Sequence, residues 1–354
     1  MKILQIAPLW FPVPPDKYGG IERVVALLAD GLVEKGHEVT LFAAPGSKSK
    51  ANIINVFNKP LIEAGISWND PIWNLRNLQM AVEYAEKNGF DIVHSHLDVW
   101  GLFFQGISKV PFVHTMHNPL YHANSDVEKD NRLKLFEEEG YRTNIALISE
   151  SARKNAMVNL PFSRVVYNGI NMDDFNLGKG GDHFIWIARV NKHKGIENAI
   201  TAAEKLGVRL TLAGRLDPSQ QNYFDAIIKP HLNEKIKFIG ELSQDQLSEF
   251  YGSAKALLYP IEWEEPFGLV VAEAMACGTP VIAYNRGSMP ELIEEGKTGF
   301  VVDSDINGMI KKMKLVDDVD RNYVREHVSK NFSKEKMVEE YEKFYEDIIK
   351  NAQN

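Results

Sequence analysis

The regular alternation of short β-rich runs with helical stripes limits the fold of this chain more than any other feature. Residues 2–7 and 38–43 are short runs of β-favouring residues, and apolar side chains recur between them at helical spacing. This stripe consists of Ile21, Val24, Val25, Leu28 and Leu32. Strands and helices that alternate in this way form parallel sheets covered by helices on both faces.

The same alternation continues and then restarts after a cluster of turn-forming residues at 168–182. Before this break we expect a helix at 75–88 and strands at 90–94 and 111–115. After it, strands are predicted at 183–190, 208–214, 235–240, 256–260, 280–284 and 299–302. We therefore expect two similar α/β domains in tandem with a cleft between them. In such sheets the ligand crevice lies outside the carboxyl ends of the strands.

Composition narrows the class of protein. The chain has 354 residues, of which 44% are hydrophobic, and a net charge of −8. This apolar share excludes a disordered chain, and the acidic balance argues against a general nucleic-acid binder. No apolar run approaches the ~20 residues of a membrane-spanning helix. With a single cysteine, Cys277, no intrachain disulfide can form, so we expect a cytoplasmic protein.

Several catalytic motifs are missing or incomplete. No Gly-x-Gly-x-x-Gly follows a predicted strand, and Gly296-Lys297-Thr298 lacks the upstream glycine of a phosphate-binding P-loop because position 291 is Glu. Five histidines fall close together: His94, His96, His114, His117 and His122. They raise the alternative of a zinc-dependent hydrolase, but the carboxylate-rich ligand set is missing. We therefore expect structural or substrate-contacting histidines and no metal.

One glycine-rich segment and one basic segment have the features of phosphate-binding sites. Gly19-Gly20 follows the first strand and opens the first helix, where unpaired N–H groups and a partial positive charge favour an anion. A plain turn would use the same residues. Arg189 and Lys194 stand at the carboxyl end of the strand predicted at 183–190, just before a helix. Cations oppose the helix dipole at that end unless an anion is present, so these two predict a phosphate site.

The segment 256–278 carries two carboxylates of interest. A strand ends at Pro260, and we expect Pro266 to start the following helix, with Glu265 at the mouth of the crevice. Glu273 lies about two turns inside this otherwise apolar helix. A buried carboxylate needs hydrogen-bond donors, which ribose hydroxyls could supply. The alternative is a helix face that reaches solvent.

Together these motifs resemble the retaining glycosyltransferases of family 4, group 1 enzymes with the GT-B fold. The resemblance rests on Gly-Gly-Ile-Glu after the first strand, Arg189 with Lys194, and Glu265-x7-Glu273 with Pro-Phe-Gly-Leu. Further matches are Asn168-Gly169, Thr115-x-His117 and Gly296-Lys297-Thr298. Tyr167 and Asn171 depart from the family pattern, which puts the linker geometry in doubt. The resemblance covers the whole chain.

The resemblance implies an acceptor-binding domain at 1–172 and a nucleotide-sugar-binding domain at 173–332, with a C-terminal helix at 333–354 that packs back on the first. The implied catalytic residues are Glu265, His117, Arg189 and Lys194. The implied donor-binding residues are Gly19, Gly20, Arg189, Lys194, Gly240, Glu241, Leu242, Phe267, Gly268, Leu269 and Glu273. Within this set, Glu273 binds the ribose, Glu265 with the backbone at 267–269 binds the sugar, and the 240–242 loop contacts the base.

The implied reaction is front-face transfer of a hexose from a nucleotide sugar, with UDP favoured and GDP an alternative, to a small-molecule, glycan or lipid-linked acceptor. It uses no cofactor and no protein base. A nucleotide-sugar 2-epimerase of the same fold, a zinc-dependent deacetylase and a non-catalytic nucleotide-sugar sensor remain as alternatives. Segment 122–142 has six acidic and four basic residues. This balance disfavours contact with an anionic bilayer beyond a peripheral one.

Overall fold

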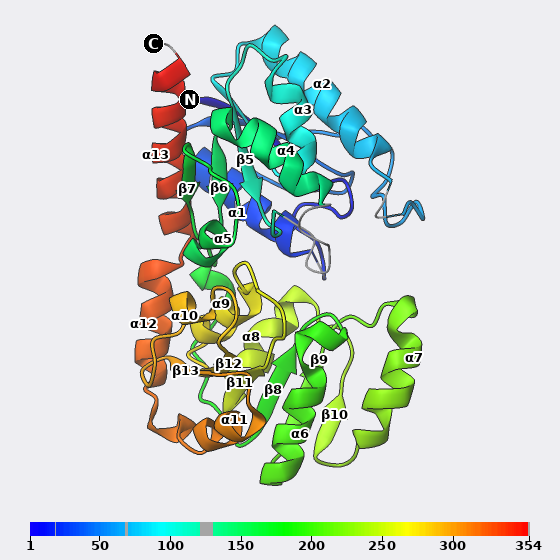
Figure 1. The fold of residues 1–354 in the computed structure, drawn as a ribbon, viewed down its shortest axis with the longest axis vertical. Coiled ribbons are helices and arrows are strands. Elements are labelled where there is room, and N and C mark those ends of the chain that lie inside the picture. The colour runs from blue at the N-terminus through cyan, green and yellow to red at the C-terminus, as the bar shows by residue number, and fades with distance from the viewer. Residues whose placement is uncertain (18, 68–69, 121–129, 353–354) are drawn as a thin grey trace. The chain divides into compact units, whose positions relative to one another are not determined.

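The computed structural model describes residues 1–17, 19–67, 70–120 and 130–352, and the chain divides into two compact units. The first unit comprises Met1–Gly169 with Lys334–Asn354, and the second comprises Ile170–Ser333. Each unit contains one parallel sheet with helices around it (Figure 1). The expectation of Rossmann-like parallel sheets in both halves is confirmed.

The sheet of the first unit has seven strands in the order β3-β2-β1-β4-β5-β6-β7. Their bounds are β1 Lys2–Ile6, β2 Glu38–Phe42, β3 Asn52–Ile54, β4 Ile92–Ser95, β5 Phe112–Met116, β6 Ile145–Leu147 and β7 Ser163–Val165. The chain moves outward from β1 in one direction and then from β4 in the other. The carboxyl ends of β1 and β4 therefore flank the point where the strand order reverses.

Helices cover both faces of this sheet. They are α1 Gly20–Glu34, α2 Ile72–Asn88, α3 Leu102–Gln105, α4 Asn131–Glu139, α5 Glu150–Lys154 and α13 Lys334–Ala352. Leu78 and Ala81 of α2 belong to one apolar cluster with Leu4 of β1. Helices α1 and α13 pack against each other, and Figure 1 shows α13 in red alongside β7.

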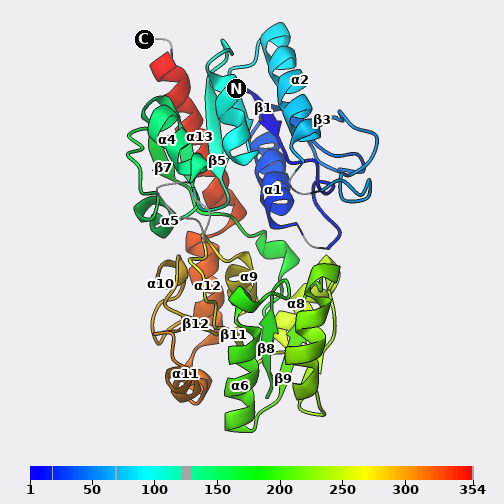
Figure 2. The ribbon, with the colours of Figure 1, turned by 45° about the vertical axis from the view of Figure 1, so that its right-hand side comes forward.

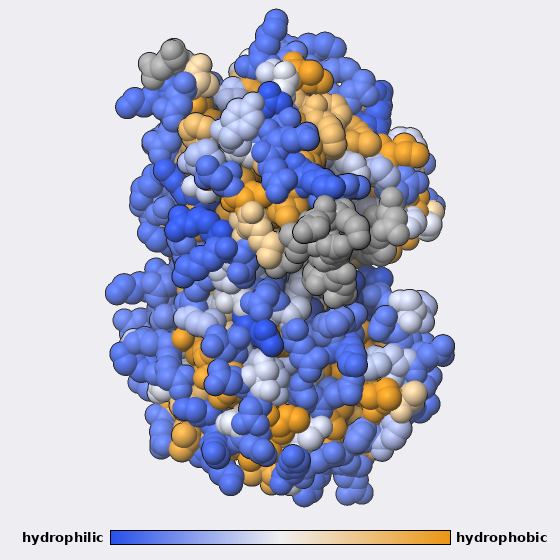
Figure 3. All heavy atoms as spheres, viewed as in Figure 1, coloured by the Kyte–Doolittle hydropathy of each residue, from blue (hydrophilic) through white to orange (hydrophobic). Residues whose placement is uncertain are grey.

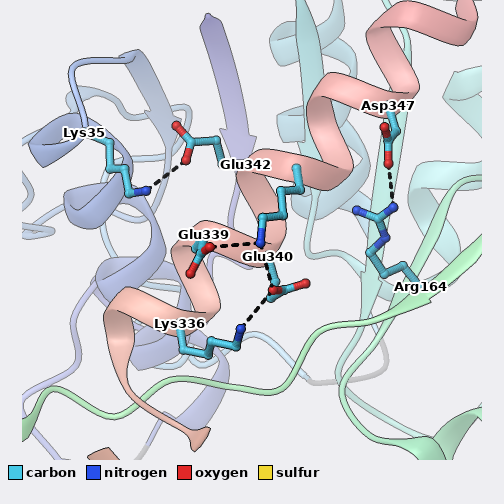
Figure 4. A network of polar contacts seen from close by, with 8 residues as sticks. Lys35, Arg164, Lys336, Glu339, Glu340, Glu342 and Asp347 are labelled. Atoms are coloured by element: carbon cyan, nitrogen blue, oxygen red, sulfur yellow. Dashed lines mark hydrogen bonds and ion pairs between the residues drawn. The ribbon is translucent and has the colours of Figure 1, made fainter. Parts of the chain in front are cut away.

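The C-terminal helix α13 is fixed to the first unit by an apolar stripe and by charged pairs. The stripe is made of Met337, Val338, Tyr341, Phe344, Tyr345 and Ile348, all buried. Lys35 of the α1 end pairs with Glu342 at 2.9 Å, and Arg164 of β7 pairs with Asp347 (Figure 4). Beneath these pairs, the Tyr345 hydroxyl lies 2.6 Å from Nδ1 of His94 on β4.

The sheet of the second unit has six strands in the order β10-β9-β8-β11-β12-β13. Their bounds are β8 Phe184–Ile187, β9 Leu210–Ala213, β10 Ile236–Phe238, β11 Ala256–Tyr259, β12 Val281–Tyr284 and β13 Gly299–Val302. The helices are α6 Ile196–Leu206, α7 Gln221–Tyr223, α8 Gln244–Gly252, α9 Leu269–Ala276, α10 Met289–Leu292, α11 Ile306–Met313 and α12 Arg321–Asn331. Helix α6 packs against β8 (Figure 2).

The glycine-rich stretch at the expected domain boundary, residues 178–181, is bound to the second unit by hydrogen bonds. The amide of Gly178 donates to the carbonyl of Cys277 at 3.0 Å, and that of Gly180 donates to Gly252 at 2.9 Å. The Arg321 guanidinium donates to the carbonyl of Gly178 at 3.0 Å. Gly178 also approaches the backbone of Gly252 so closely that a Cβ would lie 2.1 Å from it. These glycines therefore serve close backbone packing.

On the face drawn in Figure 3, hydrophilic side chains cover most of the second unit and hydrophobic residues show as separate spots. Exposed large apolar side chains of the first unit include Phe103 and Ile107. Within the described ranges, none of the helices combines the length and the apolar character needed to cross a bilayer.

We expect Tyr345→Phe to lower the free energy of unfolding by about 1–2 kcal/mol, because it leaves Nδ1 of the fully buried His94 without its partner. Lys343→Ala on the same helix removes exposed pairs with Glu339 and Glu340 and should have a much smaller effect. Urea denaturation of both variants measures the difference. Equal losses would show that the hydroxyl contact does not anchor α13.

Candidate functional site

The carboxyl edge of the second sheet gathers most of the residues that the sequence singled out. Strand β8 lies between β9 and β11, so the strand order reverses between β8 and β11. Lys194 follows β8 and Glu265 follows β11. In open parallel sheets the crevice at such a reversal is the usual place for a ligand.

Two backbone contacts bring the loops after β8 and β11 together. Gly195 has φ of +72°, and a Cβ on it would lie 1.8 Å from the carbonyl oxygen of Pro260. The amide of Glu262 donates to the carbonyl of His193 at 2.9 Å. Below them, Nε1 of the buried Trp186 donates to the carbonyl of Lys194 at 3.0 Å. Only glycine fits at position 195, and the backbone that carries Lys194 is fixed as a result.

Lys194 and Glu265 form the central ion pair of this edge. The Nζ of Lys194 lies 2.7 Å from Oε2 of Glu265, and their side chains are only 20% and 12% exposed. Tyr259 and Trp263 each donate to the same oxygen at 2.9 Å. The ammonium also lies over the ring of Trp263, 4.5 Å from its centre. A pair this deeply placed is stable only because hydrogen bonds and the ring compensate for the lost water.

The loop that carries Glu265 is held by the segment after β12. The amide of Ser288 donates to the carbonyl of Glu265 at 3.0 Å, and its hydroxyl donates to the carbonyl of Phe267 at 2.6 Å. Gly287 passes so close that a Cβ would lie 2.1 Å from the Glu265 carbonyl oxygen. Phe267 is buried beneath this loop. The sheet edge therefore fixes both the side chain and the backbone of Glu265.

The start of the helix after this loop differs from the expectation. Helix α9 begins at Leu269, not at Pro266, because Gly268 has φ of +89° and cannot continue a right-handed helix. Glu273 is consequently about one turn inside α9, not two. It is 5% exposed, and the Tyr251 hydroxyl donates to its Oε2 at 2.7 Å. The carboxylate is buried and hydrogen-bonded, so it does not sit on a solvent-facing side of the helix.

Arg189 and the 240–242 loop lie at the same carboxyl edge, after β8 and β10. The Arg189 side chain is 43% exposed, and its Nη1 is 3.9 Å from Asp217, beyond hydrogen-bond distance. Asp217 instead pairs with Arg215 at 2.7 Å. Gly240 accepts a hydrogen bond from Gly214 at 2.8 Å, and Glu241 and Leu242 are half-buried. The arginine thus keeps donors that an anion could use.

In the first unit, the two glycines lie at the amino end of α1, directly after the loop from β1. Gly19 precedes the helix and Gly20 is its first residue. Glu22, in the first turn, is 4% exposed, and burial raises its pKa to about 7. A carboxyl that is neutral below this pH does not repel an anion at the helix start. Glu22 stands in the Gly-Gly-Ile-Glu motif, but its burial was not predicted from the sequence.

Four of the five clustered histidines are buried in the first unit, and His122 lies outside the described residues. Nε2 of His94 lies 2.6 Å from the Thr115 hydroxyl, and Nδ1 of His96 lies 3.0 Å from Nε2 of His117. Nε2 of His114 lies 3.1 Å from Oε1 of Gln105. In the described part of the chain, no three His, Cys, Asp or Glu side chains converge as metal ligands would.

Burial keeps these histidines neutral. It lowers the pKa of His114 and of His117 to about 3. It lowers the pKa of His94 and His96 well below the usual value, and neighbouring histidines add to that effect. His117, which follows β5, can therefore exchange hydrogen bonds with a hydroxyl but does not supply a positive charge near neutral pH.

Models of two protein families match consecutive parts of the chain. "Glycosyltransferase Family 4" matches residues 18–174, and "Glycosyl transferases group 1" matches residues 170–335. The chain belongs to the group 1 glycosyltransferases. This confirms both the resemblance and the expectation of a sugar-transferring enzyme, and the paired sheets are those of the GT-B fold.

Named relatives agree with this glycosyltransferase assignment, and solved structures share the fold. N-acetyl-alpha-D-glucosaminyl L-malate synthase of Bacillus anthracis is 25% identical over 95% of this chain and 96% of its own length. D-inositol 3-phosphate glycosyltransferase of Mycolicibacterium smegmatis is 28% identical over 84% and 78%. The fold matches sucrose-phosphate synthase of Thermosynechococcus elongatus with a TM-score of 0.80, at 20% identity over 99% of both chains. Anabaena HepE in complex with UDP matches with a TM-score of 0.77, at 18% identity over 98% and 100%.

The sequence singled out Lys194, Arg189 and Glu265, and the structure brings Lys194 and Glu265 into direct contact. It also adds Tyr259, Trp263 and Tyr251, which sequence reasoning missed as partners of the two carboxylates. The aromatic content of the segment 259–263 was the available signal, because a carboxylate held at a partly buried edge needs donors close by in the chain.

The neutral histidines of this glycosyltransferase predict a specific loss of stability in acid. A base whose pKa is lowered by folding contributes stability that is complete above its unfolded pKa of about 6.5 and decreases as the pH falls toward the folded value of about 3. His114→Gln should therefore reduce the slope of unfolding free energy against pH, between pH 6 and 4, by up to about 1.4 kcal/mol per pH unit. Urea titrations at several pH values measure it, and an unchanged slope would contradict the buried neutral state.

Proposed function

We propose that this enzyme transfers a hexose-type sugar from a nucleotide sugar to a hydroxylated acceptor, with retention of the anomeric configuration. The observation that carries the proposal is the Lys194–Glu265 pair at the strand reversal of the second sheet, with Arg189 on the same edge. A UDP-sugar is favoured as donor and a GDP-sugar is the alternative. UDP and UDP-glucose are bound by Anabaena HepE, which supports the first choice.

The two cations suit the diphosphate of such a donor. An ammonium has three donors, and Lys194 uses one for Glu265, which leaves others for phosphate oxygens. The half-exposed guanidinium of Arg189 can hold a phosphate through two parallel hydrogen bonds. Charge that develops on the leaving diphosphate would be stabilised by these groups and requires no metal ion.

We assign the two carboxylates to different parts of the donor. Glu265, with the backbone of 267–269, would accept from sugar hydroxyls, and Glu273 would accept from the ribose. Tyr251 holds Glu273 through Oε2 and so orients this buried carboxylate. The half-buried loop of Gly240, Glu241 and Leu242 would contact the base.

The first unit would contribute Gly19 and Gly20 to phosphate binding and His117 to the sugar, as the family resemblance implies, and would bind the acceptor. A neutral His117 can orient a hydroxyl but is too weak a base to ionise it. We therefore assign the acceptor's proton to the departing phosphate, in a front-face attack. The names of two relatives contain L-malate and D-inositol 3-phosphate. They favour a small hydroxylated acceptor over a glycan or a lipid-linked one.

Arg189→Ala should weaken UDP binding about tenfold to a hundredfold, since hydrogen bonds to charged groups contribute ~1.5–3 kcal/mol. Uridine affinity should stay unchanged because uridine carries no phosphate. Lys192→Ala removes an exposed lysine from the same loop and is the matched control. Calorimetry with both ligands measures the effect, and equal losses for UDP and uridine would overturn the phosphate assignment.

The first-formed product should keep the donor's anomeric configuration, which proton NMR measures. An inverted product would remove the retaining mechanism and the role assigned to Glu265. Conversion of the donor sugar without any acceptor would point to a 2-epimerase.

Sugar transfer should survive excess EDTA, because Lys194 and Arg189 stabilise the diphosphate without a metal ion. Inactivation by EDTA that one equivalent of metal reverses would contradict this metal-independent stabilisation.

A further inference from the structure

Within the described ranges, the hydrogen bonds to the Glu265 carboxylate all end at one of its two oxygens. Lys194, Tyr259 and Trp263 all donate to Oε2, at 2.7, 2.9 and 2.9 Å. Among the described residues, none donates a hydrogen bond to Oε1. A carboxylate oxygen has two lone pairs, so three donors leave Oε2 no capacity for another, while Oε1 keeps its full capacity.

Each of the three donors is itself fixed in place. Tyr259 is the last residue of β11 and is 2% exposed. Trp263 makes two contacts, one through its N–H to the carboxylate and one through its ring face to the ammonium. The backbone of Lys194 is held by Trp186. The two oxygens of a carboxylate are chemically equivalent. The positions of the three donors therefore decide in which direction the oxygen that can still accept a hydrogen bond points.

We propose that Trp263 and Tyr259 are positioning residues which, with Lys194, saturate one oxygen of Glu265 and leave the other as a single acceptor for one hydroxyl of the transferred sugar. This inference rests on the proposed function. It deepens that function by naming what makes Glu265 selective among sugars. A single acceptor oxygen that points in one direction accepts a hydrogen bond from a hydroxyl at one position of the sugar ring. A more loosely held carboxylate would accept hydroxyls at several positions.

Glu265→Gln tests the open oxygen with little change of shape. The amide oxygen would remain on the three donors, because the amino group cannot accept from them. The amino group would then occupy the open position and present donors where an acceptor stood. Trp263→Phe and Tyr259→Phe test the donors to Oε2, since each variant removes one of these donors and keeps an aromatic ring.

The experiment measures UDP release from UDP-glucose and from its monodeoxy analogues, with water as acceptor, together with the affinity for free UDP. In the wild type, we expect one deoxy analogue to react at least about tenfold more slowly than UDP-glucose. In Glu265→Gln, UDP release from UDP-glucose should be slower by about tenfold or more. The slow deoxy analogue should then react as fast as UDP-glucose, because the variant has already lost the hydrogen bond between the carboxylate and that hydroxyl.

Trp263→Phe and Tyr259→Phe should each lower kcat by about tenfold and reduce the discrimination between the analogues, with UDP affinity within about twofold of the wild type. Trp73→Phe in the first unit and Tyr323→Phe are matched controls. Tyr323→Phe removes a tyrosine–carboxylate hydrogen bond of 2.7 Å, to Glu294, on the surface. Neither control should change kcat. Thermal unfolding of every variant shows that it is folded.

Two results would overturn the inference while the proposed function stands: wild-type kinetics in the two phenylalanine variants, or full discrimination between the deoxy analogues in Glu265→Gln. A wild-type enzyme that binds neither UDP nor GDP, and releases neither of them from a nucleotide sugar, would overturn the proposed function and the inference with it. The wild-type measurement therefore reports on the function, and the variants report on the positioning.

Discussion

The contact on which the second unit depends is the ion pair between Lys194 and Glu265. It joins the segment after β8 to the segment after β11, the two strands between which the strand order reverses. A pair with so little exposure would destabilise the fold if either charge were left alone. The surrounding indole, phenol and backbone contacts are therefore needed to keep the pair in one geometry.

The same arrangement explains why this edge is suited to charged ligands. Parallel strands place all their following loops on one side, so cations after β8 and carboxylates after β11 and in α9 come from distant parts of the sequence to one edge. Glycines at 195 and 287 let these loops approach within backbone contact. The first unit has a related arrangement, with glycines after β1 and histidines after β4 and β5, but its histidines are buried and neutral.

Much of this could be read from the sequence. The helical stripe at 21–32 and the β-rich runs predicted the alternation correctly, because periodic burial leaves a direct pattern in the chain. The strands β3, β6 and β7 have three residues each and were missed, whereas the equally short β10 was predicted within the run 235–240. The start of α9 was misplaced because Pro266 is a common first helical residue, whereas the conformation of Gly268 is decided by packing. The aromatic donors to Glu265 were missed because side-chain direction at a loop is not encoded in spacing.

Binding of the donor diphosphate at the carboxyl edge of the second unit can be tested by hydrogen exchange followed by mass spectrometry, with and without UDP. We expect UDP to slow exchange in peptides that cover residues 188–195 and 262–273, with little change in α11 and α12. Protection by UDP that leaves both of those segments unaffected would show that the diphosphate binds elsewhere.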